Sequence, residues 1–68
     1  MSTVYAPHQQ RVVDEQVELD TKRTALKSFI DTSPMFKSLP DAERGRLIHQ
    51  YQVMTQYSPI LTERIAAF

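Results

Sequence analysis

Basic and aromatic side chains are the residues of this sequence best suited to holding a ligand. Tyrosine rings stack on flat groups such as nucleobases, and Lys and Arg side chains make charge-assisted hydrogen bonds to phosphates. The predicted ligand-binding residues are Tyr5, Lys22, Arg23, Arg44, Arg46, Tyr51 and Tyr57. Together they favour an anion that carries planar rings.

Residues for catalysis or metal binding are sparse. The chain has no cysteine and one glycine, which excludes cysteine-based metal sites and glycine-rich phosphate loops. His8 and His49 are far apart, and neither has a metal ligand at helical spacing. Asp14 and Glu18 are one helical turn apart, and we interpret them as part of a solvated face. We therefore expect no enzyme, no metal site and no cofactor.

Prolines divide the chain into helices, and no strand pattern is present. The predicted elements are an extended arm over residues 1–6, a helix over 7–30, a connecting turn over 31–38 and a second helix over 39–67. Ser33 and Pro34 are expected to begin a short helical segment within the turn. Ser38 and Asp41 resemble a capping box that begins the second long helix.

Pro59 lies inside the second predicted helix. It has no backbone N–H to donate to the Thr55 carbonyl, and its ring crowds that carbonyl. We expect a kink near residues 55–59. The alternative is a complete break, with Ser58 capping a separate last helix.

Apolar residues repeat every seven positions in both long helices, which predicts an all-α antiparallel hairpin. The two series are Val12, Leu19 and Leu26, and then Leu47, Met54, Leu61 and Phe68. Polar residues flank this seam, and the antiparallel register places Glu15 opposite Arg64 in a partly buried ion pair. Gln50 follows along the same side. These residues either set the helix register or line a polar pocket between subunits.

Five further apolar residues do not fit one seam: Val13, Val17, Ile48, Val53 and Ile60. A hairpin of 68 residues has little core of its own, so we expect self-association into a helical bundle. The alternative is that these are the scattered aliphatic residues of an ordinary protein surface.

Charge is uneven along the predicted hairpin although the whole chain is neutral. The turn end carries six basic and three acidic residues, and the open end carries two basic and five acidic residues. The turn end therefore suits an anion, particularly next to a helix N-terminus. The alternative is head-to-tail complementarity between copies.

Zero net charge argues against a general or sequence-specific DNA-binding protein. The sequence shows no apolar run of membrane-spanning length and no signal peptide pattern. We expect a soluble cytoplasmic protein without a membrane partner.

A pattern of charged and apolar residues covers nearly the whole chain beyond residue 8. It consists of Arg11-Val12-Val13, Glu15, Glu18-Leu19, Lys22, Leu26, Phe29, Ile30, Phe36, Leu39-Pro40, Glu43, Leu47, Gln50, Met54, Tyr57, Leu61, Arg64-Ile65 and Phe68. This pattern resembles a family of very small proteins encoded by tailed phages and prophages. Pro59 departs from it, because an ordinary helix former is expected there.

The chain is also similar in size and helicity to phage sponge proteins. These assemble as oligomers and sequester cyclic oligonucleotides or cyclic ADP-ribose-type signals of the CBASS and Thoeris defences. The resemblance implies a counter-defence protein of the host cytoplasm that binds such a signal between subunits. Two alternatives are an inhibitor that docks on a host defence effector or nuclease, and a structural or regulatory phage accessory protein.

Overall fold

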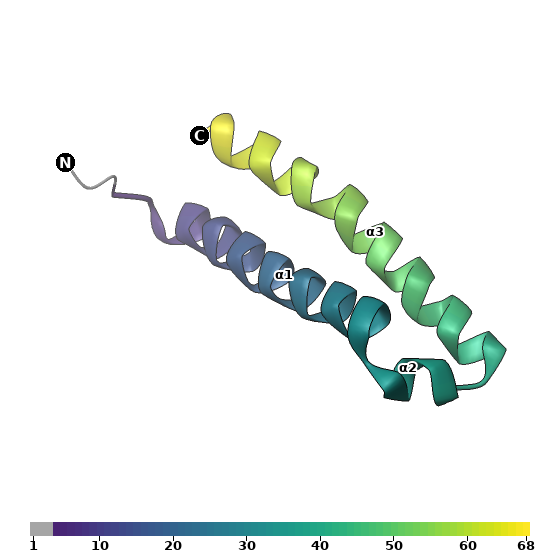
Figure 1. The fold of residues 1–68 in the computed structure, drawn as a ribbon. Coiled ribbons are helices and arrows are strands. Elements are labelled where there is room, and N and C mark those ends of the chain that lie inside the picture. The colour runs from purple at the N-terminus through teal and green to yellow at the C-terminus, as the bar shows by residue number, and fades with distance from the viewer. Residues whose placement is uncertain (1–3) are drawn as a thin grey trace.

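Residues 4–68 are described by the computed structural model and form three helices. They are α1 (Pro7–Thr32), α2 (Pro34–Ser38) and α3 (Asp41–Ala66). The long helices run antiparallel beside each other, with α2 at the turn and the chain ends at the opposite end (Figure 1). The predicted all-α antiparallel hairpin is confirmed. Residues 1–3 of the predicted arm lie outside the described residues.

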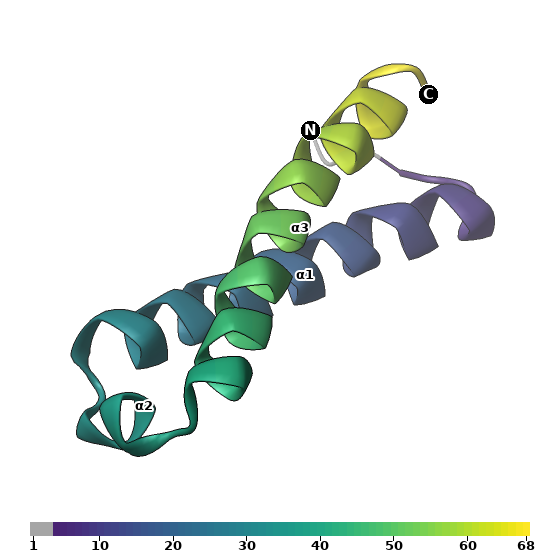
Figure 2. The same ribbon diagram turned by 90° about the vertical axis from the view of Figure 1, so that its right-hand side faces the viewer.

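Seen after a 90° turn about the vertical axis, the two long helices cross each other (Figure 2). The shape is elongated, with principal extents of 47 × 19 × 15 Å. Crossed helices pack most closely around the crossing and diverge towards both ends. The middle of the hairpin is therefore where side chains of α1 and α3 meet.

Helix α1 begins at Pro7, whose missing N–H would have no intrahelical partner in the first turn. The Ala6 N–H just before it donates to Gln9 Oε1 at 2.9 Å. The helix ends at Thr32, two residues beyond the predicted range. It ends there because Ser33 precedes a proline and takes the extended conformation that this position favours.

Helix α2 begins as the sequence predicts. The Ser33 hydroxyl oxygen accepts a hydrogen bond from the Met35 N–H at 3.2 Å. Phe36 packs edge to face on Phe29 of α1, with ring centroids 6.0 Å apart. The turn is therefore held by one capping contact and one aromatic pair.

The predicted capping box for the second long helix is wrong. Ser38 belongs to α2, and its hydroxyl donates to the Met35 carbonyl at 2.7 Å. Pro40 occupies the position before α3 and offers no side-chain acceptor, while the Asp41 carboxylate pairs with Arg44. Asp41 still lies in the first turn of α3, where a negative charge is favourable.

Helix α3 runs without interruption from Asp41 to Ala66 and contains Pro59 (Figure 1). A break at this proline is therefore wrong, and the kink stays a prediction. Ser58 does not cap a new helix, because its hydroxyl points across to α1 and donates to Asp20 Oδ1 at 2.7 Å.

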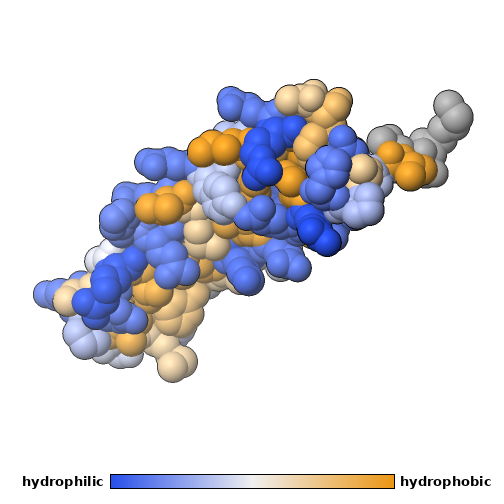
Figure 3. Space-filling model, turned by 180° about the vertical axis from the view of Figure 1, so that it is seen from behind, coloured by the Kyte–Doolittle hydropathy of each residue, from blue (hydrophilic) through white to orange (hydrophobic). Residues whose placement is uncertain are grey.

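The apolar core is small. Among residues 4–68 the buried apolar side chains are Val12, 7% exposed, and Leu61, 0% exposed. The other seam residues are half-buried or, at Phe68, exposed. Of the five apolar residues outside the seam, Val13 is half-buried and the rest are exposed: Val17, Ile48, Val53 and Ile60. Apolar atoms accordingly reach the surface between polar ones along the hairpin (Figure 3).

Candidate functional site

A polar cluster occupies the place where α1 and α3 cross. The Gln16 amide of α1 donates to the Ser58 carbonyl at 3.3 Å and to the Thr62 hydroxyl. Ser58 is buried and donates to Asp20, which also lies 3.5 Å from the Arg23 Nε. These hydrogen bonds fix the register of the two helices, because each joins residues about 40 positions apart in sequence.

This polar cluster is not among the features predicted from the sequence. Gln16 and Ser58 fall on the same helical lines as half-buried apolar residues of the seam. Polar residues at such positions are the sequence feature that indicates a polar cluster, because buried polar groups require hydrogen-bond partners. Their partners follow only from the register and the crossing of the helices.

On one side of this crossing, Tyr57 of α3 donates its hydroxyl hydrogen to the Glu15 carboxylate of α1. That hydrogen bond raises the pKa of Tyr57 above its ordinary value, with smaller contributions from desolvation and from the Glu15 charge. The nearby Arg64 charge acts in the opposite direction.

The predicted ion pair between Glu15 and Arg64 does not form within residues 4–68. Tyr57 lies two helical turns before Arg64 on the same line of α3, and it takes the position beside Glu15. Arg64 is exposed and makes no ion pair with another described residue.

Three of the predicted ligand-binding residues lie away from Tyr57 and contact other side chains of the hairpin. They are Arg23 of α1 and Arg44 and Tyr51 of α3. Arg44 pairs with Asp41, and Arg23 lies beside Asp20. Tyr51 lies under the Lys27 ammonium group, 6.0 Å from the ring centroid to Nζ. Their charges and rings are therefore engaged within the hairpin.

Tyr5 is separated from all other predicted ligand residues. It packs edge to face on Phe68, with ring centroids 5.8 Å apart, at the open end of the hairpin. This contact ties the segment before α1 to the end of the chain. It places Tyr5 at the opposite end from Arg44 and Arg46 (Figure 1).

The remaining predicted residues share the side that carries the Tyr57–Glu15 contact. Lys22 lies on the same line of α1 as Glu15, seven positions further on, and Arg46 and Gln50 lie on the same line of α3 as Tyr57. Lys22 makes no ion pair within the described residues, and Arg46 pairs with Glu43 at 2.8 Å.

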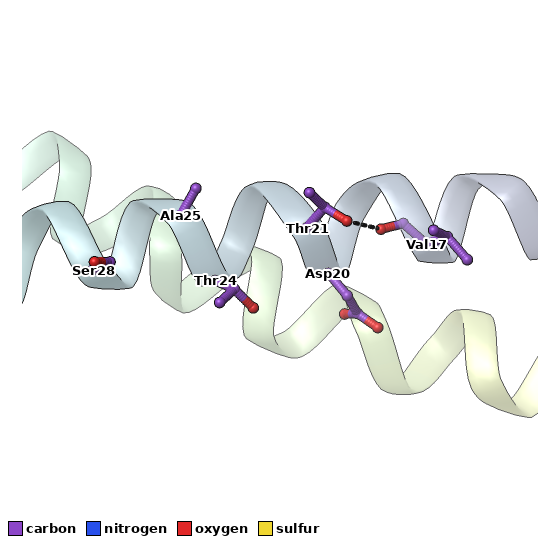
Figure 4. Close-up of a pocket in the computed structure, with 6 residues that line it drawn as sticks. All are labelled: Val17, Asp20, Thr21, Thr24, Ala25 and Ser28. Carbon is purple, nitrogen blue, oxygen red and sulfur yellow. Dashed lines mark hydrogen bonds between the residues drawn. The ribbon is translucent and has the colours of Figure 1, made fainter.

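Two open grooves mark the surface. The larger, about 660 Å³, is lined by residues of α1 alone and reaches the crossing of the helices at Asp20 (Figure 4). Small and uncharged side chains make up most of its lining, and its one charged residue is Asp20, so it does not suit an anion.

The smaller groove, 320 Å³, lies on α3 and has a chemically different lining. Its residues are Arg46, His49, Gln50, Val53 and Met54. A guanidinium group, an imidazole and an amide meet apolar side chains there, which is a combination that can hold a phosphate beside a flat apolar ring. This groove, with neighbouring Tyr57, is the candidate functional site.

A family model named Sequestin matches residues 6–67, which is nearly the whole chain. The chain belongs to the Sequestin family. The family name denotes sequestering of a molecule, which agrees with a binding site. No curated protein and no solved structure matches the chain. None of the helices in residues 4–68 has the length and apolar character needed to cross a membrane.

Proposed function

We propose that this protein is a phage-encoded counter-defence protein that sequesters a cyclic nucleotide immune signal in the host cytoplasm, without catalysing a reaction. The observation that carries the proposal is the match to the Sequestin family over residues 6–67. The family name refers to the sequestering of a molecule, and the small helical fold is similar to that of phage sponge proteins.

The α3 groove supplies chemistry that suits such a ligand. Arg46 can form a bidentate contact to a phosphodiester, and His49 and Gln50 add hydrogen-bonding groups beside it. Val53, Met54 and the neighbouring Tyr57 offer apolar and aromatic surface to a base. The groove is open to solvent, so a ligand held by one hairpin alone would remain largely exposed.

Isothermal titration calorimetry with cyclic dinucleotides, cyclic trinucleotides and cyclic ADP-ribose isomers tests the proposal. One class is expected to bind, with an affinity that falls as salt rises because exposed charges are screened within about 10 Å at 0.1 M. At 100 times its dissociation constant, the bound ligand should stabilise the fold by about 2.7 kcal/mol.

Arg46→Ala and Arg44→Ala are a matched pair of variants. Both remove one exposed i,i+3 ion pair of α3, but only Arg46 lines the groove. Arg46→Ala should weaken binding, and Arg44→Ala should leave it nearly unchanged. Absence of binding heat with every ligand at tens of micromolar protein would contradict the proposal and favour an inhibitor that docks on a host protein.

A further inference from the structure

Two arginines near the start of α3 use different nitrogens for their ion pairs. A guanidinium group carries one N–H on Nε, next to the alkyl stem, and four on its two terminal nitrogens. Arg46 donates its Nε hydrogen to Glu43 Oε1 at 2.8 Å. Arg44 donates a hydrogen of its terminal Nη2 to Asp41 Oδ1, and its Nε is buried without a hydrogen-bond partner among the described residues. Both pairs join residues three positions apart, but they leave different edges of the guanidinium group available.

This difference decides which arginine can take an anion. The hydrogen bond to Glu43 leaves both terminal nitrogens of Arg46 without a partner in residues 4–68. Two parallel N–H groups form the edge with which arginine makes a bidentate contact to phosphate. The Arg46 side chain is 69% exposed, and in this conformation it lines the α3 groove. Arg46 is therefore held at Nε and open at its terminal edge.

Glu43 is well placed to hold Arg46. It lies in the first turn of α3, where the free N–H groups favour a negative charge. A glutamate that precedes its basic partner along a helix also has the more favourable order for such a pair. The Glu43 side chain is 42% exposed and is not part of the lining of the α3 groove. Glu43 can thus orient Arg46 without touching a molecule in the groove.

We propose that Glu43 is a positioning residue of the α3 groove, which holds Arg46 by its Nε so that the two terminal nitrogens remain free for an anion. The identity of that anion, a phosphate group of the cyclic signal, rests on the proposed function. The inference adds a residue that acts on the ligand only through Arg46.

Positioning and simple charge repulsion have opposite consequences for binding. A carboxylate near an anion site repels the anion, so its removal would tighten binding. Removal of a positioning group weakens binding, because the free arginine side chain must lose its rotational freedom when the anion binds. Glu43 and Arg46 lie at the surface, where water and salt weaken the repulsion but not this entropic cost. We therefore expect positioning to dominate.

Calorimetry with inorganic pyrophosphate tests the sign of the effect. Pyrophosphate is the probe because it presents ionised phosphate oxygens without a base. Glu43→Ala should raise its dissociation constant about two- to fivefold. Asp41→Ala is the matched control, since it removes an equal charge from the same turn of α3 and leaves the partner of Arg46 in place. This control should leave binding unchanged or slightly tighter.

Two results of this titration would overturn the proposal. One is tighter binding of pyrophosphate by Glu43→Ala than by the wild type, which would make Glu43 a source of repulsion only. The other is a wild-type protein that binds no pyrophosphate at millimolar concentration. Circular dichroism checks that the variants keep their helices.

Glu43→Gln separates position from charge. The glutamine amide oxygen can accept the same hydrogen bond from the Arg46 Nε, but it carries no charge. Glu43→Gln should therefore recover at least part of the affinity for pyrophosphate that Glu43→Ala loses. Equal affinities of these two variants would contradict a positioning role.

Nitrogen-15 NMR of the arginine side chains gives a readout that needs no ligand. The Arg46 Nε–H signal, identified by its loss in Arg46→Lys, should exchange with water more slowly in the wild type than in Glu43→Ala. Asp41→Ala should leave this exchange rate unchanged. Equal exchange in the wild type and in Glu43→Ala would show that Glu43 does not hold Arg46, and would overturn the proposal.

These results separate the two proposals. Pyrophosphate binding that depends on Glu43, without binding of any cyclic nucleotide, leaves this inference standing and removes the proposed function. Binding of a cyclic nucleotide that Glu43→Ala leaves unchanged or tightens does the reverse.

Discussion

Tyr57 of α3 donates its hydroxyl hydrogen to the carboxylate of Glu15 on α1, 42 positions away in the sequence. The contact joins the long helices on the side that carries the candidate ligand residues. It uses the tyrosine hydroxyl as donor, and Tyr57 is half-buried next to the α3 groove in the sequence of that helix. Glu15 thereby positions Tyr57 without contributing to the groove itself.

The first prediction concerns the titration of Tyr57. Its pKa in the folded protein is raised above the ordinary value of 10.0, chiefly by the hydrogen bond to Glu15. The stabilisation of the fold by this hydrogen bond is therefore complete below pH 10.0, and it is lost as the pH rises through the folded-state pKa of Tyr57. In Glu15→Gln, absorbance titration should show one of the three tyrosines titrating at lower pH than in wild type. An unchanged titration curve would show that Glu15 does not hold Tyr57.

The second prediction concerns Leu61, which is fully buried in a core that contains few buried apolar residues. Leu61→Ala should lower the free energy of unfolding by about 2–5 kcal/mol through lost burial and a residual cavity. Val17→Ala, at an exposed site, should change it by about 0.5 kcal/mol or less. Urea denaturation followed by circular dichroism measures both, and equal midpoints would place Leu61 outside the core.

The third prediction concerns the polar cluster at the crossing. Ser58→Ala removes the donor to Asp20 and should lower the free energy of unfolding by about 1 kcal/mol. Ser28→Ala, at an exposed position of α1, serves as the control and should have a smaller effect. Chemical denaturation of both variants gives the comparison. A larger loss for Ser28→Ala would contradict the hydrogen bond.

The fourth prediction concerns Arg64. The sequence pattern implies a partly buried ion pair with Glu15, whose disruption would cost about 3–5 kcal/mol. The structure leaves Arg64 exposed and gives Glu15 a different partner, so Arg64→Ala should cost only about 0–1 kcal/mol in the monomer. Arg11→Ala, also exposed, should cost about as much. Thermal unfolding at low protein concentration measures both. A much larger loss of stability for Arg64→Ala would indicate that the ion pair with Glu15 forms after all.

The fifth prediction concerns Pro59, which lies inside a continuous helix at an exposed position. Pro59→Ala restores an N–H that can bond to the Thr55 carbonyl, and it should raise the melting temperature, since proline costs up to about 3 kcal/mol in a helix interior. A lower melting temperature would mean that the proline shapes the helix so that Ser58 reaches Asp20.

Local chemistry decided the elements of this fold. Pro7, Ser33 and Pro34 act on their own backbone and nearest neighbours, so the start of α1 and the cap of α2 follow from sequence. The heptad spacing of apolar residues likewise predicts the antiparallel hairpin, because helix periodicity fixes which residues share a face.

Which residues of α1 and α3 contact each other depends on more than helix periodicity. Heptad spacing shows that Tyr57 and Arg64 share a line of α3, but not which of them lies beside Glu15. The crossing of the helices and the rotation of each about its own axis decide that, and these depend on packing along the whole contact (Figure 2).

The tertiary structure also decided which candidate ligand residues act together. The sequence supplies basic and aromatic residues on both long helices, and their chemistry alone does not group them. The fold directs Arg44 and Tyr51 to one side of the hairpin and Arg46 and Tyr57 to the other, with Tyr5 at the open end. Residue type thus determined what the surface can bind, and the packing of α1 on α3 decided where, because it fixes which side of each helix remains exposed.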